Sequence, residues 1–319
     1  MKISVLGTGR WGSFIAWYLS NHGHEVCVWG RSDSNSFINL SKTYKNEYVT
    51  FDKKVEFSSD LSYAINRAEV VVISISAQGL RELASKIVSL GGKEKIFLLC
   101  MKGVEVDTGK RLTEVCADVG ISKDNLAVWV GPGHIQEFTK GNPNCMVIDS
   151  TNKELVKYLA DTFRSELIRF YYGDDIIGTE IGAAAKNVMG IAAGMLDGGG
   201  YSTLKGPLMA RGAREIARLI KALGGNEFSA YGLAHLGDYE TTLFSKFSNN
   251  RNFGESYVLG KPFVKLAEGV TTAKALKTLG EKYDVDLPIT NAVCSIIYDK
   301  KDPMTVFLSL FSRSTRKEF

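Results

Sequence analysis

A glycine-rich turn stands between two short apolar runs in residues 1–30 and leaves few folds open to the chain. Residues 1–6 predict a buried strand, and Gly7, Gly9 and Gly12 follow it directly in a Gly-x-Gly-x-x-Gly pattern. An amphipathic helix is expected after Gly12, and residues 25–30 predict a second strand. Glycines at these spacings allow a tight turn and let a pyrophosphate approach the N-terminus of the helix. The segment therefore predicts the start of a dinucleotide-binding fold.

The end of the second strand bears on which nicotinamide cofactor is bound. A fold that selects NAD places an acidic residue there for the ribose hydroxyls, but this chain has Trp-Gly-Arg-Ser at residues 29–32, and Asp33 comes later. Arg31 can pair with a 2′-phosphate or stack on adenine, or it can be an ordinary exposed loop arginine. The sequence favours NADPH and leaves NADH open.

The same alternation of strands and helices continues to about residue 176. Apolar runs predict strands at residues 70–75, 95–100, 126–130 and 145–149, with helices at 79–90 and 152–163. Such continuous apolar strands are typical of a parallel sheet covered on both faces. The predicted fold class is therefore α/β, a Rossmann-type doubly wound parallel sheet. Lys102 and the turn at Gly131 follow two of these strands, so both are expected at the crevice where such sheets bind ligands.

Residues 178–198 predict one long, mostly apolar helix with internal glycines. Each internal glycine costs the helix about 1 kcal/mol relative to alanine, which indicates that another backbone or a ligand lies very close. Lys186 and Asn187 interrupt this small, apolar surface. The lysine either extends out of a core helix or points into a cleft as a desolvated acid or anion ligand, and spacing alone favours neither.

The remainder of the chain is predicted to be helical. Further helices are expected from Pro207 to just before Gly224 and over residues 263–283 and 289–298. We therefore predict a dinucleotide-binding domain at residues 1–177 and a smaller, all-helical substrate domain at residues 178–319. One face of the helix after Pro207 carries four basic residues, interpreted as a solvated face: Arg211, Arg214, Arg218 and Lys221.

Composition restricts the partners of the chain. Its 39 basic and 35 acidic residues give a net charge of +4, which is too small to argue for nucleic acid but compatible with a local site for an anionic metabolite. Five scattered cysteines without a CxxC pair indicate reduced thiols and a cytoplasmic protein. We expect no membrane span and, because no metal-ligand spacing is present, no metal site.

At this level of detail the chain resembles the NAD(P)-dependent glycerol-3-phosphate dehydrogenases over nearly its full length. The matching segments are residues 7–13, 102–103, 131–132, 178–198, 237–238, 248–254, 267–270 and 287–289. The resemblance implies a cytoplasmic enzyme that reversibly reduces dihydroxyacetone phosphate to sn-glycerol 3-phosphate with NADH or NADPH and feeds glycerophospholipid synthesis. The expected partners are this small phosphorylated substrate and a second copy of the chain in a homodimer.

The resemblance also implies roles for individual residues. Lys186 would be the general acid, Lys102 would polarise the carbonyl oxygen, and Asp238 would hold Lys186 in place. The implied cofactor-binding residues are Gly7, Gly9, Arg10, Trp11, Gly12, Arg31, Tyr48, Lys102, Ile135, Asn249 and Glu268. The implied substrate-binding residues are Lys102, Gly131, Gly133, Lys186, Asn187, Asp238, Ser248, Asn249, Asn250 and Arg251. Hydride addition builds negative charge on oxygen, which preorganised cations stabilise, and two close, buried lysines lower each other's pKa.

Some positions depart from the family pattern. The family usually has Ser-Arg-Asn where this chain has Ser248-Asn249-Asn250, so Arg251 is the candidate cation for the phosphate. Gly133 replaces a usual serine or threonine, and further differences occur at residues 49–50 and 76. These departures leave the catalytic lysines in place but bear on substrate affinity and cofactor preference.

Two other functions remain open from the residues alone. A related two-domain dehydrogenase acting on a hydroxyacid or sugar acid would also place a lysine on the interdomain helix. A non-catalytic nicotinamide-nucleotide sensor would keep the nucleotide fold and lose turnover. Lys102 and the loop around Ser248 favour the phosphorylated ketone over the first alternative. A measurement of turnover distinguishes an enzyme from the second alternative, the sensor.

Overall fold

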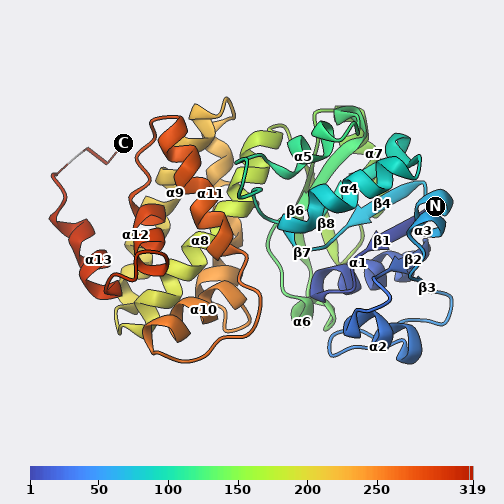
Figure 1. Cartoon of the computed structure of the whole chain (residues 1–319), viewed down its shortest axis with the longest axis horizontal. Coiled ribbons are helices and arrows are strands. Elements are labelled where there is room, and N and C mark those ends of the chain that lie inside the picture. The colour runs from blue at the N-terminus through green and yellow to red at the C-terminus, as the bar shows by residue number, and fades with distance from the viewer. Residues whose placement is uncertain (316, 319) are drawn as a thin grey trace.

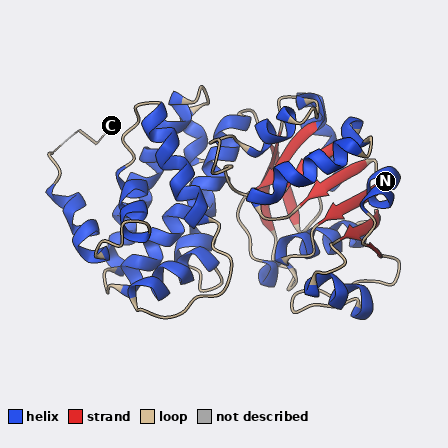
Figure 2. Cartoon of the chain, in the orientation of Figure 1, coloured by secondary structure: helices blue, strands red, loops and turns tan. Residues whose placement is uncertain are grey.

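The computed structural model describes residues 1–315, 317 and 318, and its first half is built on one eight-stranded sheet (Figures 1 and 2). The strands are β1 (Lys2–Leu6), β2 (Glu25–Trp29), β3 (Glu56–Ser58), β4 (Val70–Ile73), β5 (Ile96–Leu99), β6 (Leu126–Val130), β7 (Asn144–Asp149) and β8 (Ile168–Tyr172). Their order is β3-β2-β1-β4-β5-β6-β7-β8. Every neighbouring pair is parallel except β6 and β7. The predicted Rossmann-type sheet is confirmed, with this one antiparallel pair as the exception.

Helices cover the sheet and then form the second half of the chain. Those of the first half are α1 (Arg10–Asn21), α2 (Asn35–Thr43), α3 (Leu61–Arg67), α4 (Leu80–Ser89), α5 (Leu112–Asp118), α6 (Ile135–Phe138) and α7 (Lys153–Phe163). Those of the second half are α8 (Ile176–Gly198), α9 (Lys205–Ala222), α10 (Asn249–Val258), α11 (Gly269–Lys282), α12 (Pro288–Ile297) and α13 (Pro303–Ser309). Within the described residues, no helix has the length and apolar character to cross a membrane.

One expected helix begins later than predicted. Residues 263–268 precede α11 as irregular chain, and the helix begins at Gly269. The backbone N–H of Gly269 donates to the side chain of Asn250 at 2.9 Å. A contact between residues distant in sequence therefore sets the start of α11, and local periodicity does not report it.

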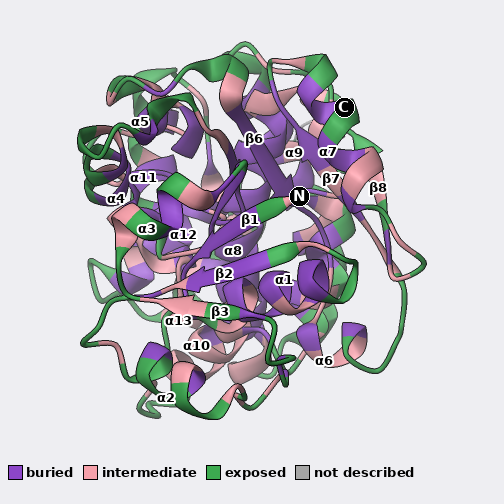
Figure 3. Cartoon of the chain, turned by 90° about the vertical axis from the view of Figure 1, so that its right-hand side faces the viewer, coloured by how far each residue is buried: buried purple, intermediate pink, exposed green. Residues whose placement is uncertain are grey.

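The sheet has an apolar core on each face, and the helices beyond it have their own. Successive residues of β4 alternate between the two sheet cores, Val70 and Val72 on one face and Val71 and Ile73 on the other. In Figure 3 the strands β1, β2 and β6 are mostly purple, the colour of buried residues. The third core surrounds α8, which is buried along most of its length. This burial places the Lys186 helix between the sheet and the outer helices.

The glycines of α8 are explained by a second backbone. A Cβ atom at Gly194 would lie 1.9 Å from the carbonyl oxygen of Arg251, and one at Gly254 of α10 would lie 2.1 Å from the carbonyl oxygen of Ile191. The two helices therefore pack backbone against backbone, as the sequence predicted for a glycine-bearing helix. This contact fixes α10 against the lysine helix. The first residues of α10, Asn249, Asn250 and Arg251, are among those expected to bind substrate.

Gly194→Ala is expected to destabilise the protein by at least about 1–3 kcal/mol, because the added methyl group overlaps backbone that cannot swing away. Gly206→Ala on α9 is the matched control, since a Cβ there meets no atom within 4 Å. That substitution should stabilise the fold by up to about 1 kcal/mol through helix propensity. Denaturant unfolding of both variants measures the difference, and equal stabilities would show that α8 and α10 do not pack this closely.

Candidate active site

Two lysines and one carboxylate form the centre of the site. Lys186 comes from α8, Lys102 from the chain just after β5, and Asp238 from the short helical turn Leu236–Asp238. The Oδ2 atom of Asp238 lies 2.7 Å from Nζ of Lys102 and 2.9 Å from Nζ of Lys186. Lys102 also donates to the carbonyl oxygen of Gly131 at 2.9 Å. The fold thus joins the ends of β5 and β6 to the lysine helix.

Burial controls the charges of this cluster. Lys186 is 8 % exposed and Asp238 is 1 % exposed. Burial lowers the pKa of Lys186 to about 8; Asp238 opposes this shift and Lys102 adds to it. Burial would by itself raise the pKa of Asp238, but the two lysines hold it below its ordinary value. The cluster therefore holds a lysine that can give and take a proton near neutral pH beside an ionised carboxylate.

Two threonines complete the cluster and were not predicted from the sequence. Lys186 donates to Oγ1 of Thr242 at 2.8 Å, and the hydroxyl of Thr241 donates to Oδ1 of Asp238. Both threonines follow Asp238 within the π-helical turn Glu240–Phe244. Their spacing from Asp238 gives no periodic signal, because a π-helical turn is rarely identifiable from sequence.

Asn187 connects three helices to the sheet. Its Nδ2 donates to the carbonyl oxygen of Lys102 at 3.4 Å, and its Oδ1 accepts from Nδ2 of Asn250 at 3.0 Å. Asn250 in turn holds the N-terminus of α11. Ser248 begins α10 by accepting a hydrogen bond from the backbone N–H of Arg251. The structure thus brings Asn187, Ser248 and Asn250 to one region, next to the lysine helix.

Arg251 lies apart from the lysine cluster. Its Nε donates to Oδ2 of Asp197 at 2.7 Å, and its Nη1 lies 3.0 Å from Oε2 of Glu255. Asp197 follows Lys186 by eleven residues on α8, about 16 Å along the helix axis. Asp197 also pairs with the buried Lys205 at 2.6 Å. The guanidinium is therefore committed to carboxylates, and the phosphate role expected from the sequence would require these ion pairs to break.

Asn249, at the position of the family's arginine, is also bound within the protein. Its Nδ2 donates to the carbonyl oxygen of Leu266 at 3.2 Å, in the loop before α11. The side chain carries no charge, so it offers a phosphate only a neutral donor. The rim of the site lacks a cation at this position.

The turn before α1 has the geometry of a nucleotide cradle. Gly7 has φ +126°, and a Cβ there would lie 2.2 Å from the carbonyl oxygen of Ser74. At Gly12 a Cβ would lie 2.3 Å from the carbonyl oxygen of Gly7, whereas at Gly9 it would meet no atom within 4 Å. Gly7 and Gly12 therefore allow tight backbone packing, and Gly9 leaves open space at the N-terminus of α1.

The donors around this turn fit a dinucleotide. No side chain caps α1 at its N-terminal residue, so its first N–H groups point at the open space. The indole Nε1 of Trp11 is buried and has no hydrogen-bond partner among the described residues. The guanidinium of Arg10 lies 5.3 Å from the centre of the Tyr48 ring and donates to the carbonyl oxygen of Phe247 at 3.4 Å. Arg10 therefore spans from the nucleotide half to the loop before α10.

The other expected cofactor residues are spread around the same edge of the sheet. Arg31 is 76 % exposed, and its Nε lies 3.5 Å from Oδ1 of Asp33. Glu268 is half-buried beside Ser76 and Ala77 at the end of β4, and burial raises its pKa. Ile135 is buried in the core at the start of α6. Arg31 is thus exposed enough to meet a ligand, although it pairs with Asp33, whereas Ile135 contributes packing.

The turn after β6 explains one departure and reveals a neighbour. Gly133 has φ +149°, and a Cβ there would lie 2.2 Å from the Phe138 ring, so the usual serine or threonine would not fit this arrangement. His134 follows, with its ring 5.6 Å from that of Phe247. Its Nε2 is buried without a partner in the described chain, and burial and then Lys186 lower its pKa. The sequence did not single out this neutral histidine, which lies close to the lysine cluster.

No three His, Cys, Asp or Glu side chains of the described residues are grouped as metal ligands would be. The sheet order, the glycine cradle and the buried lysine on a helix beyond the sheet define a class of two-part α/β proteins that bind a dinucleotide.

Comparison with known proteins narrows this class. Family models described as the N-terminus and C-terminus of NAD-dependent glycerol-3-phosphate dehydrogenase match residues 2–156 and 175–308. The chain therefore belongs to the NAD-dependent glycerol-3-phosphate dehydrogenase family.

Individual relatives are similar to this chain over nearly its full length. The chain is 34% identical over 329 residues to glycerol-3-phosphate dehydrogenase [NAD(P)+] of Thermoanaerobacter sp., covering 100% of this chain and 99% of the relative. It is also 34% identical over 332 residues to the protein of the same name from Chlorobium phaeobacteroides, with 100% and 99% covered. The crystal structure of glycerol-3-phosphate dehydrogenase from Coxiella burnetii superimposes with a TM-score of 0.91 at 26% identity, covering 98% of this chain and 99% of that one.

Proposed function

We propose that the chain reversibly reduces dihydroxyacetone phosphate to sn-glycerol 3-phosphate with NADH or NADPH, using Lys186 as the proton donor. Its relatives carry the name of this reaction. The observation that carries the proposal is the buried cluster of Lys186, Lys102 and Asp238, in which the pKa of Lys186 is about 8. A lysine tuned in this way can serve as acid in one direction and base in the other.

The residues of the cluster divide the work of the reaction. When bound, the reduced nicotinamide would supply the hydride that bonds to the carbonyl carbon. As this bond forms, negative charge develops on the carbonyl oxygen, and Lys186 gives that oxygen its proton. Lys102 stabilises the charge in a site with little water. Asp238 holds both ammonium groups within 2.9 Å. In the reverse direction, neutral Lys186 takes the proton from the hydroxyl group.

The direct test is loss of reduced-cofactor absorbance when dihydroxyacetone phosphate is added to the purified chain. A related hydroxyacid dehydrogenase would instead oxidise the cofactor with a 2-oxo acid and ignore the phosphorylated ketone. A nucleotide sensor would bind the cofactor without turnover of either substrate. We expect turnover with dihydroxyacetone phosphate alone.

We propose that the substrate phosphate lies near Asn187, Ser248, Asn249 and Asn250, where amide donors and the N-terminus of α10 converge. Asn249→Arg is expected to lower the KM for dihydroxyacetone phosphate about tenfold, because a charge-assisted hydrogen bond is about twice as strong as a neutral one. Steady-state kinetics measure this effect. Asn249→Gln, which lengthens the side chain without adding charge, is the matched control and should not lower the KM.

The same experiment tests Arg251. If Asn249→Arg left the KM unchanged while Arg251→Ala raised it at least about tenfold, Arg251 would be the phosphate ligand that the sequence suggested. The ion pairs with Asp197 and Glu255 lead us to expect the opposite: a loss of stability in Arg251→Ala with little change in KM.

We propose that Arg31 contacts the ribose 2′-phosphate and makes NADPH the preferred cofactor. Arg31→Ala should weaken NADPH binding about tenfold and NADH binding less than about twofold, since only NADPH offers a phosphate to the guanidinium. Fluorescence titration with each cofactor measures both affinities. Lys42→Ala, which removes another exposed cation from α2, serves as the control. Equal losses for both cofactors would mean that Arg31 stacks on adenine or does not touch the nucleotide.

We also propose the wider setting of the enzyme. Residues 1–177 would be the cofactor domain and 178–319 the substrate domain, a division close to the start of α8 at Ile176. All five cysteines are free thiols, which suits a cytoplasmic enzyme that supplies glycerophospholipid synthesis. A homodimer is the proposed assembly, and sedimentation equilibrium tests it.

A further inference from the structure

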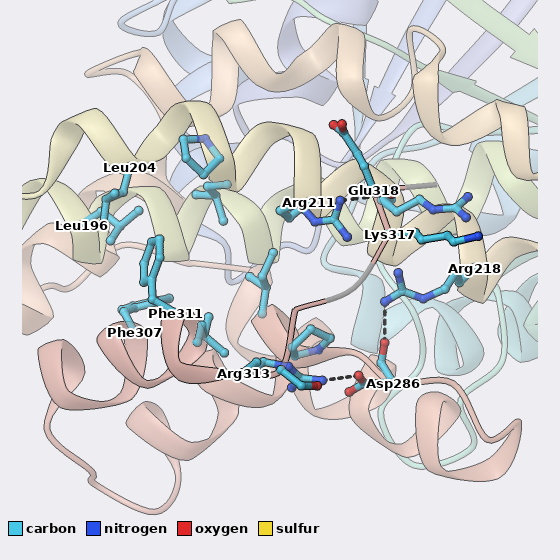
Figure 4. A pocket seen from close by; sticks show the side chains of 17 residues that line it. Leu196, Leu204, Arg211, Arg218, Asp286, Phe307, Phe311, Arg313, Lys317 and Glu318 are labelled. Atoms are coloured by element: carbon cyan, nitrogen blue, oxygen red, sulfur yellow. Dashed lines mark hydrogen bonds and ion pairs between the residues drawn. The ribbon is translucent and has the colours of Figure 1, made fainter.

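A pocket of about 560 Å³ opens on the helical half, apart from the lysine cluster. It lies between α9, α12, α13 and the residues that follow α13 (Figure 4). None of the residues that line it was assigned to cofactor or substrate. Leu196 of α8, one of its lining residues, follows Lys186 by ten positions, about 15 Å along the helix axis. The pocket is large enough for an organic ligand, since such sites span about 300–1,000 Å³.

The two ends of the pocket differ in chemistry. Leu196, Leu204, Phe307 and Phe311 gather at one end, and the basic side chains of α9 stand at the other (Figure 4). Phe311 is 62 % exposed. Phe311 therefore leaves apolar surface exposed at this end of the pocket, beside Phe307 and the two leucines.

The charged end carries an excess of positive charge. Among the described residues, five cationic side chains line the pocket against two carboxylates. Arg211, Arg214 and Arg218 recur at helical spacing on one face of α9, the face expected from the sequence to be solvated. Arg211 is exposed, as expected, and Arg214 and Arg218 are partly buried where they line the pocket. Lys221, the fourth basic residue, lies outside the pocket and pairs with Glu227 at 3.0 Å.

The arginines differ in how far they are already paired. Arg218 donates to the carbonyl oxygen of Asp286 at 2.8 Å, and Arg211 donates to the carbonyl oxygen of Glu318 at 3.3 Å. The side chain of Arg214 has no hydrogen bond or ion pair with any part of the chain that the structure describes. Burial lowers the pKa of Arg218; Glu215 and Asp286 oppose this shift, and repulsion from the neighbouring Arg214 and Arg211 adds to it. An anion at this end would relieve that repulsion.

We propose that this pocket binds a single-chain amphiphile with a phosphate monoester head, of the acyl glycerol phosphate class. The acyl chain lies along the leucines and phenylalanines, and the phosphate lies against Arg214 and Arg218. A phosphate monoester carries a charge of about −1.5 to −2 at neutral pH, which suits a group of guanidinium forks better than a single carboxylate does. The glycerol phosphate head rests on the proposed function, because acylation of the proposed product yields this class.

The test uses the full chain without cofactor or substrate, titrated calorimetrically with 1-dodecanoyl-glycerol 3-phosphate below its micelle concentration. Saturable binding to one site per chain is expected. Arg214→Gln and Arg218→Gln should each weaken it at least about tenfold, because a charge-assisted contact is lost. Lys221→Gln removes the same charge from the same helix outside the pocket and should change the affinity less than about twofold. Phe311→Ala, at an exposed position, should weaken binding while leaving the circular dichroism spectrum unchanged.

Other ligands separate the parts of the proposal. Equal affinity for dodecyl maltoside would overturn the anionic head, and equal affinity for dodecanoate would overturn the phosphate. Equal affinity for glycerol 3-phosphate would overturn the acyl chain. If the ligand did not bind, and the mass measured by sedimentation fell in Arg214→Gln, the pocket would be an interface between copies of the chain. That outcome would overturn the proposal. Because neither cofactor nor turnover enters this measurement, an enzyme inactive on dihydroxyacetone phosphate would still give a clear result.

Discussion

Lys186→Ala is expected to lower the turnover of dihydroxyacetone phosphate by about 10²–10⁴-fold and to leave cofactor affinity nearly unchanged. The loss is expected from removing the proposed proton donor, since a positioned acid contributes about this factor. Lys102 would still stabilise the oxygen but would have no neighbour able to deliver the proton. Stopped-flow oxidation of the reduced cofactor gives the turnover, and fluorescence titration gives the cofactor affinity.

A matched control separates catalysis from packing. Lys205 of α9 is also buried, at 7 % exposure, and also pairs with an aspartate, Asp197. Lys205→Ala should therefore cost stability with little effect on turnover of the folded protein. Near-normal turnover in Lys186→Ala would overturn its role, and Lys102 would then be the candidate donor.

Asp238→Asn is expected to have the second large effect, on both stability and the pH profile. The carboxylate is buried between two lysines, and removing one partner of a buried ionic group costs about 3–5 kcal/mol. The carboxylate also opposes the lowering of the Lys186 pKa. Without it, that pKa falls below about 8.

The direction of the pH effect follows from the acid role. In the proposed mechanism reduction requires protonated Lys186, so we expect its rate in the unmodified enzyme to fall as the pH rises through about 8. In Asp238→Asn this fall should move to lower pH by about one unit or more, equivalent to about 1.4 kcal/mol. The pH dependence of the turnover rate, measured with saturating substrate and cofactor, reports the shift.

Glu180→Gln is the control for Asp238→Asn. Glu180 is another buried carboxylate on α8, but it pairs with Arg111 at 2.6 Å and not with the lysines. Its loss should reduce stability and leave the fall of the reduction rate with rising pH near pH 8. If the fall in rate stayed near pH 8 in Asp238→Asn, Lys186 would not be the group whose titration limits the rate.

Strands buried within the sheet were predictable, and edge strands were not. The strands β1, β2, β4, β5, β6 and β7 read as apolar runs because neighbours and helices cover them. The two edge strands, β3 and β8, were missed. Only the first residue of β8 is buried, and β3 has three residues, none of them buried. An edge strand exposes much of its surface, so its residues lack the apolar pattern that identifies a strand.

The sequence by itself determined the fold class and two of the features at which the site forms, the glycine turn and the lysine helix. The glycine turn admits a dinucleotide, and a lysine within a glycine-bearing apolar helix either extends out of the core or points into a cleft. These conclusions need only local spacing, since backbone sterics and burial act on neighbouring residues.

Only the tertiary structure decided which groups meet. It placed Asp238 between two lysines that are 84 residues apart in the chain, committed Arg251 to Asp197, and folded the α9 arginines into a pocket. The physical reason is that ion pairs and hydrogen bonds act over a few ångströms, and long-range packing sets those distances. The sequence shows which residues are cationic, whereas the fold determines which carboxylate each cation pairs with.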